Sequence, residues 1–135
     1  MGGLIVRVYL DSAPVIYVVE RVGPFWSAVL KRLSGSETEL FASDMTRLEC
    51  RVKPLRDGDT DLLKDFDDYF QNAVAQIVSL SRQVIDLATE IRAKHRIKTP
   101  DSIHLAAAIV SCCDVFLTND HRLDSFTDIA IEVTI

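Results

Sequence analysis

Short apolar runs alternate along the chain with longer segments in which apolar residues recur every three or four positions. The short runs are rich in β-branched and large apolar side chains, which is typical of strands buried in a sheet. The longer segments have the spacing expected of helices that bury one face. The predicted strands are 4–10, 38–43, 73–80, 114–118 and 129–134.

Capping and helix-breaking residues set the expected helix ends. Ser12 and Ser81 can each cap a helix through the hydroxyl oxygen, and Gly35 and Pro54 are expected to end helices. Pro100 suits the first turn of a helix, where its missing N–H leaves no bond unmade. The predicted helices are 12–20, 25–33, about 46–54, 62–70, 81–91 and 100–112.

Strands separated by helices predict an α/β fold, with a mainly parallel central sheet of four to five strands that is flanked by helices and joined by right-handed crossovers. The 135 residues and the 48% hydrophobic content suit one domain over residues 1–135. In such sheets the functional crevice lies outside the carboxyl ends of the strands. Candidate functional residues are therefore expected at that edge.

Charge narrows the classes of partner. The net charge of −5 argues against a protein that holds polyanions by bulk charge. Basic residues nevertheless gather in 91–98 and aspartates in 57–68, although each run can also be a solvated face. No apolar run is long enough to cross a bilayer and no leader pattern precedes the first strand, so we expect a cytoplasmic protein without membrane association.

Four acidic residues are expected at the carboxyl edge of the sheet. Asp11 directly follows the first strand, and Asp120 follows the fourth strand by one residue. Glu49 and Asp101 lie near the starts of helices that run back from this edge, because a helix between parallel strands runs opposite to them. Acids from four distant segments are thus expected to converge.

Each acid also has a simpler explanation. Aspartate is favoured at helix starts and turns, and Thr46 with Glu49 fits a capping box. Several carboxylates on one edge repel one another, however, unless protons or a cation neutralise them. Mg²⁺ and Mn²⁺ are hard divalent cations that take oxygen ligands. We therefore interpret the four acids as a candidate metal site, compatible with one or two ions.

Four short stretches resemble a known family. They are YLDS (9–12), TRLEC (46–50), TPDSIHLAAAIV (99–110) and FLTND (116–120). Together they resemble PIN-domain ribonucleases, in particular the VapC toxins of type II toxin–antitoxin pairs. The resemblance covers nearly the whole chain, and TPDSIHLAAA and LTND are its most specific parts.

The resemblance implies a metal-dependent endoribonuclease, the toxin of a toxin–antitoxin pair, with assigned roles for individual residues. The acidic catalytic pocket, which would bind Mg²⁺ or Mn²⁺, would consist of Asp11, Glu49, Asp101 and Asp120. Its main metal ligands would be Asp11 and Asp101. The polar residues that support it would be Ser12, Thr118 and Asn119.

Two other functions remain compatible with the same residues. One is a PIN-like module that binds RNA or protein without cleavage, and the other is a housekeeping RNA-processing nuclease. The partners expected for the toxin are its RNA substrate and a cognate antitoxin, in a homodimer or a toxin–antitoxin hetero-oligomer. An antitoxin groove could be lined by Tyr17, Phe25 and Trp26, which would otherwise be plain core.

The basic run 91–98 leads directly into the helix that carries Asp101. Arg92, Lys94 and Lys98 are candidate substrate-binding residues, because they could position RNA phosphates beside the acids. His104 lies one helical turn after Asp101 and could touch the substrate. A buried structural histidine is the better interpretation of that residue.

Overall fold

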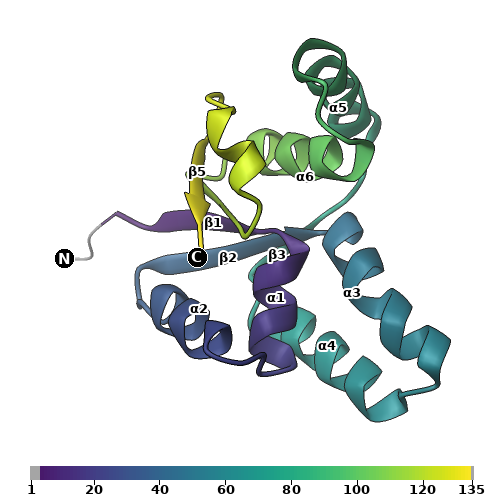
Figure 1. The fold of residues 1–135 in the computed structure, drawn as a ribbon. Coiled ribbons are helices and arrows are strands. Elements are labelled where there is room, and N and C mark those ends of the chain that lie inside the picture. The colour runs from purple at the N-terminus through teal and green to yellow at the C-terminus, as the bar shows by residue number, and fades with distance from the viewer. Residues whose placement is uncertain (1–3, 135) are drawn as a thin grey trace.

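Five parallel strands form the central sheet in the computed structural model, which describes residues 4–134 (Figure 1). The strand order is β3-β2-β1-β4-β5, and each neighbouring pair is parallel. The α/β class and the parallel sheet that the sequence predicted are therefore confirmed. The strands are β1 (Val6–Leu10), β2 (Thr38–Ser43), β3 (Gln76–Val78), β4 (Val115–Thr118) and β5 (Ala130–Val133).

Helices cover both faces of the sheet. Figure 1 shows α1 to α4 on one face and α5 with α6 on the other. None of the helices within residues 4–134 is long and apolar enough to span a membrane. The helices are α1 (Ser12–Val19), α2 (Phe25–Leu33), α3 (Asp44–Asp57), α4 (Thr60–Asn72), α5 (Arg82–His95) and α6 (Thr99–Val110), and a 3₁₀ helix, η1 (His121–Ser125), follows β4.

Alternate side chains of β1 enter two separate hydrophobic cores. Val8 and Leu10 pack with Phe66 of α4 on the face covered by α1 to α4. Tyr9 points the other way and packs with Leu105 of α6. All five of these side chains are fully buried, with relative exposure of 0%. A strand that is buried on both faces needs a continuous apolar run, which is the pattern that predicted β1.

The predicted strands all form, and β2 has the predicted bounds of 38–43. The prediction of a strand over 73–80 was too long, since β3 contains only residues 76–78. Ala73 belongs to the end of α4, because its N–H bonds to the carbonyl of Tyr69. The other three strands are shorter than predicted by one or two residues.

The start of α1 differs from the prediction that Ser12 is its cap. Asp11 is the capping residue, and its carboxylate accepts a hydrogen bond of 2.7 Å from the backbone N–H of Ser12. Ser12 is instead the first residue of the helix, and its hydroxyl donates to Glu49. The simpler explanation of Asp11 as a helix-start residue is thus correct for one of its oxygens.

The capping box at α3 lies three residues earlier than the sequence suggested. Ser43 caps the helix, and the Thr46 hydroxyl accepts a hydrogen bond from the N–H of Ser43. The predicted pairing of Thr46 with Glu49 was therefore wrong, and Glu49 is released for another role. Pro54 does not end α3, which continues to a stop at Gly58 in the left-handed conformation, with φ of 68°.

The last predicted helix was also displaced. We expected it over 100–112, whereas α6 begins at Thr99 and ends at Val110. Cys112 has a left-handed φ of 61°, which takes the chain out of the helix before β4 begins. Asp101 lies in the first turn of α6, at the carboxyl edge of the sheet, as the chain direction required.

Candidate active site

The candidate active site lies where β1 and β4 meet at the carboxyl edge of the sheet. The chain leaves β1 toward β2 and β3, and later crosses to β4 and β5 on the other side of β1. Crevices in parallel sheets form where connections diverge in this way. The N–H of Asp11 donates to the carbonyl of Leu117 at 3.0 Å, which fixes the two strand ends together.

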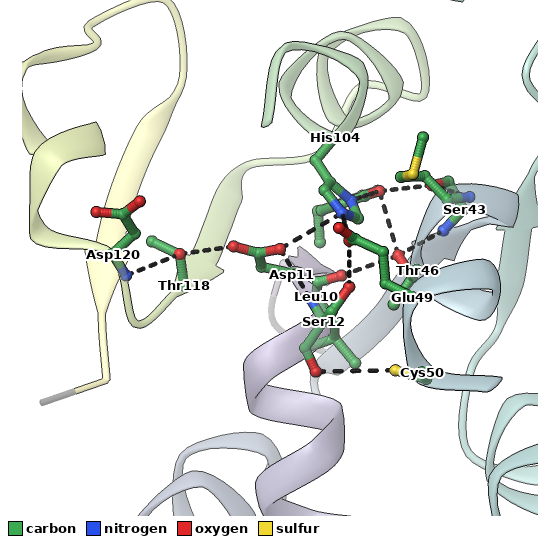
Figure 2. A network of polar contacts seen from close by, with 12 residues as sticks. Leu10, Asp11, Ser12, Ser43, Thr46, Glu49, Cys50, His104, Thr118 and Asp120 are labelled. Carbon is green, nitrogen blue, oxygen red and sulfur yellow. Dashed lines mark hydrogen bonds and ion pairs between the residues drawn. The ribbon is translucent and has the colours of Figure 1, made fainter. Parts of the chain in front are cut away.

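Both carboxylate oxygens of Asp11 are fixed by hydrogen bonds. One oxygen accepts from the N–H of Ser12, and the other accepts from the Thr118 hydroxyl, each at 2.7 Å. The Thr118 oxygen also accepts the backbone N–H of Asp120 at 3.0 Å. Figure 2 shows Thr118 between the two aspartates. Thr118 therefore links the position of Asp11 to the loop that carries Asp120.

Glu49 reaches the site from α3 and is held by two donors. Its Oε1 accepts from the Ser12 hydroxyl at 2.6 Å and lies 2.5 Å from Nε2 of His104. Burial alone would raise the pKa of Glu49, but the hydrogen bonds from His104 and Ser12 outweigh it and lower the pKa below its ordinary value. Glu49 is therefore a carboxylate at neutral pH.

His104 connects this carboxylate to a buried hydroxyl network. Its Nδ1 lies 2.7 Å from the Tyr9 hydroxyl, which also contacts Ser43 at 2.7 Å and Thr46 at 3.3 Å. Because ionised Glu49 can only accept, Nε2 of His104 must be the donor. Tyr9 and His104 are fully buried, at 0% exposure. The network thus fixes the imidazole ring and, through it, Glu49.

Three side chains form the tightest polar group of the site. Asp11, Glu49 and His104 each present one atom within 4.8 Å of the other two. Nε2 of His104 lies 3.5 Å from Oδ1 of Asp11 as well as 2.5 Å from Glu49, so its proton lies between two acids. This proton partly offsets the repulsion between the two carboxylates.

Asp101 and Asp120 lie beside that group, in a pocket of about 240 Å³. Burial raises the pKa of Asp101, and the negative charges of Asp11, Asp120 and Glu49 add to the increase. No hydrogen bond among residues 4–134 engages the Asp101 carboxylate. Asp120 is different, because hydrogen bonds from Arg122 lower its pKa. Asp101 is therefore the one acid of the four whose carboxylate accepts no hydrogen bond from the described residues.

The other residues predicted to support the site or bind substrate lie at separate places around it. The Asn119 amide donates to the Tyr17 hydroxyl at 2.7 Å. The Arg92 guanidinium donates to the carbonyl of Ile97, in the loop that precedes α6, at 2.9 Å. Lys94 is exposed on α5. Lys98 lines the pocket that contains Asp101 and Asp120.

The aromatic residues predicted to line a groove lie around the α1–α2 turn. The rings of Tyr17 and Phe25 are 5.0 Å apart, and the guanidinium of Arg21 lies 5.8 Å from the Trp26 ring centroid. All three aromatic side chains are partly buried.

Sequence reasoning gave too little weight to His104 and none to Tyr9. His104 is buried and satisfied, as its structural interpretation required, yet its partners belong to the acidic site. A usable signal existed, because a tyrosine hydroxyl in a doubly buried strand needs a hydrogen-bond partner. The chain does not indicate which partner, since His104 is 95 residues away.

The sequence model of the PIN domain matches residues 8–129. The chain belongs to the PIN-domain family. This match includes all four acids of the candidate site and the two residues, Tyr9 and His104, that fix Glu49. No curated protein matches the chain.

Solved structures share the fold of this PIN domain at low sequence identity. VapBC2 from Rickettsia felis, bound to a DNA fragment from its promoter, is 14% identical with a TM-score of 0.76, over 94% of this chain and 98% of that chain. DNA-bound VapBC from Salmonella typhimurium is 14% identical with a TM-score of 0.74, over 97% and 100%. Mycobacterium tuberculosis VapC20, a Sarcin-Ricin loop cleaving toxin, is 12% identical with a TM-score of 0.70, over 91% and 98%.

Replacement of Tyr9 by phenylalanine tests the buried network. The Tyr9→Phe variant should lose about 1–3 kcal/mol of unfolding free energy, because it leaves buried partners without the hydroxyl. The matched control is Tyr17→Phe, whose hydroxyl contacts exposed Asn119 and should change stability by less than about 0.5 kcal/mol. Urea unfolding would measure both variants. Equal losses would contradict the network.

Asp101→Asn tests the uncompensated charge. The folded state raises the pKa of Asp101, so the wild-type protein loses stability as pH rises through the window above the ordinary aspartate value. In chelator at neutral pH, Asp101→Asn should therefore be more stable than wild type, by a small amount because solvent screens this half-buried group. The gain should disappear near about pH 4.

The control for that comparison is Asp61→Asn, which removes an exposed acid from the first turn of α4. It should lower stability by about 0.3–1 kcal/mol through the lost helix-dipole interaction. Thermal unfolding at both pH values gives the comparison. A loss of stability in Asp101→Asn at neutral pH would contradict the electrostatic explanation.

Proposed function

We propose that this PIN domain is a metal-dependent endoribonuclease, the toxin of a toxin–antitoxin pair. The observation that carries the proposal is the convergence of Asp11, Glu49, Asp101 and Asp120 at one edge of the sheet, with a raised pKa at half-buried Asp101. Such a group is suited to bind a cation beside a phosphodiester. The VapC20 structure, described as that of a Sarcin-Ricin loop cleaving toxin, shares the fold and supports the same choice.

The carboxylate oxygens of the four acids fit Mg²⁺ or Mn²⁺ as ligands. Asp11 and Asp101 would hold the ion, and Glu49 and Asp120 would complete its surroundings directly or through water. Carboxylate oxygens are the ligands that these ions take. Burial and, after it, the neighbouring negative charges raise the pKa of Asp101, and a bound cation would stabilise its charged form. When bound, the metal would supply an activated water and stabilise negative charge on the phosphate.

The chain's own residues would prepare this chemistry. Thr118 holds one oxygen of Asp11 and the backbone of Asp120, so it would keep both acids at a fixed separation. Ser12 and His104 hold Oε1 of Glu49, which leaves its second oxygen for water or metal. Asn119, which is bonded to Tyr17, would fix the loop between Thr118 and Asp120.

The proposed partners are RNA and a cognate antitoxin. Structural neighbours include VapBC structures and a structure from Klebsiella pneumoniae that is described as a toxin–antitoxin complex. The partly buried aromatic residues Tyr17, Phe25 and Trp26 are the proposed contact region for an antitoxin segment. A homodimer or a toxin–antitoxin hetero-oligomer is the expected assembly, acting in the cytoplasm.

Cleavage of a mixed RNA pool tests the proposal. Purified protein should cleave RNA with Mn²⁺ or Mg²⁺ and stop in chelator, and Asp101→Asn should lower the rate by at least about 100-fold. Asp61→Asn, at an exposed position on α4, should cleave as wild type does. New 5′-phosphate ends, detected by a ligation assay, would report the products.

The alternatives give different results in the same assay. Folded protein that binds RNA without cleavage at any metal concentration would favour the non-cleaving module. Cleavage confined to precursor RNAs, without growth arrest on expression in cells, would favour the housekeeping nuclease.

Thr118→Val tests the support of Asp11. The substitution preserves shape but removes the hydroxyl that donates to Asp11, so Mn²⁺ should bind roughly 10–100-fold more weakly. Isothermal titration without RNA would measure this affinity, and cleavage should fall with it. Thr127→Val, at an exposed position, is the control. Unchanged Mn²⁺ affinity in Thr118→Val would contradict the role of Thr118.

A further inference from the structure

The pocket that contains Asp101 and Asp120 is also lined by basic residues. It lies between the loop that joins α5 to α6 and the turn that follows β4, and Arg96, Lys98 and Arg122 line it. We call these three residues the basic pocket. One small cavity of about 240 Å³ is thus lined by both acids and bases.

We propose that the basic pocket binds a phosphate of the RNA strand next to the bond that is cleaved. The inference rests on the proposed nuclease function and adds the place where the substrate strand is held. Each nucleotide of RNA carries a phosphate, so a strand can present one phosphate to the acids and a neighbouring one to the bases. The planar guanidinium of arginine matches phosphate oxygens in pairs.

The backbone of Arg96 supports a role for its side chain. Arg96 caps the end of α5 in the left-handed conformation, with φ of 56°. Glycine is the residue that this position favours, and α3 ends on one, Gly58, with φ of 68°. The local fold would thus be better served by glycine at position 96. The pocket explains why an arginine stands there instead.

Hydrogen bonds to its backbone fix the loop that carries Arg96 and Lys98. The carbonyl of Ile97 accepts from the Arg92 guanidinium at 2.9 Å and from the Ser102 hydroxyl at 3.1 Å. Arg96 and Lys98, on either side of Ile97, are exposed. A site on a fixed backbone loses little entropy when it binds a ligand. Arg92 would therefore contribute by positioning the loop.

Arg122 can exchange its present partner for a phosphate. It binds both carboxylate oxygens of Asp120, at 3.0 and 2.8 Å, but its side chain is 72% exposed. The Asp120 carboxylate is only 20% exposed, but the guanidinium is open to solvent, so a phosphate can reach Arg122 and compete for it. Displacement would also release Asp120 toward the metal side of the pocket.

Arg96→Gly is the direct test. In chelator, where RNA stays intact, fluorescence anisotropy would measure binding of a short fluorescein-labelled single-stranded RNA over a range of salt concentrations. Arg96→Gly should weaken binding roughly 10-fold and reduce the salt slope by about 0.7, the value for one lost phosphate contact. With Mn²⁺, the KM for cleavage should rise by a similar factor while kcat stays within about twofold.

Arg21→Gly is a closely matched control. Arg21 also has a left-handed φ, 52°, and the substitution removes the same charge, but Arg21 lies over Trp26 in the turn between α1 and α2. Glycine relieves the left-handed backbone at both positions but adds freedom to the unfolded chain, so the two changes in Tm should be small and similar. Only Arg96→Gly should change RNA binding. Should Arg96→Gly fail to fold, Lys98→Gln replaces it, because the Lys98 side chain does not cap α6.

The outcomes separate the basic pocket from the nuclease. If Arg96→Gly or Lys98→Gln binds RNA as Arg21→Gly does while wild type cleaves RNA, the proposal that the basic pocket binds phosphate is wrong. The proposed nuclease function would then be retained. Equal weakening by Arg96→Gly and Arg21→Gly would indicate bulk charge and would also overturn the pocket. Binding that depends on Arg96 without any cleavage would support the pocket and overturn the nuclease.

Discussion

The hydrogen bond from Thr118 to Asp11 joins the two strand ends on which the whole site depends. These residues end β4 and begin α1 at the place where the connections of the sheet diverge, so no crossover covers them. The same hydroxyl accepts the N–H of Asp120 and extends the constraint to the following turn. Because both partners are buried, a change in either strand moves the acids. The sheet topology therefore determines the geometry of the site.

A second constraint comes from the other face of the sheet. Tyr9 packs in the core beneath α6, and its hydroxyl is satisfied only through Ser43, Thr46 and His104. His104 in turn fixes Glu49, so the core positions a candidate catalytic acid. Packing and polar satisfaction act together here, since a buried hydroxyl without partners would be destabilising. A substitution in the core can thus alter the proposed chemistry without touching it.

Charge is distributed unevenly around the acids. His104 is shared by Asp11 and Glu49, and Arg122 compensates Asp120. Asp101 is half-buried and accepts no hydrogen bond from the described residues, and its burial with the nearby acids raises its pKa. The bases that line the same pocket would allow an acidic protein, with net charge −5, to bind a polyanion. Local placement, not net charge, would govern recognition.

The sequence by itself determined the order of the strands and helices, the two-sided burial of β1, and the arrival of four acids at one edge. Periodicity and chain direction are local properties, so they can be read without coordinates. The tertiary structure alone decided that Asp11 caps α1, that Ser43 replaces Thr46 as the cap of α3, and that Glu49 meets His104. The two caps are local hydrogen bonds, but neighbouring residues in the chain offered more than one possible cap. The contact between Glu49 and His104 joins residues 55 positions apart, which no local pattern specifies.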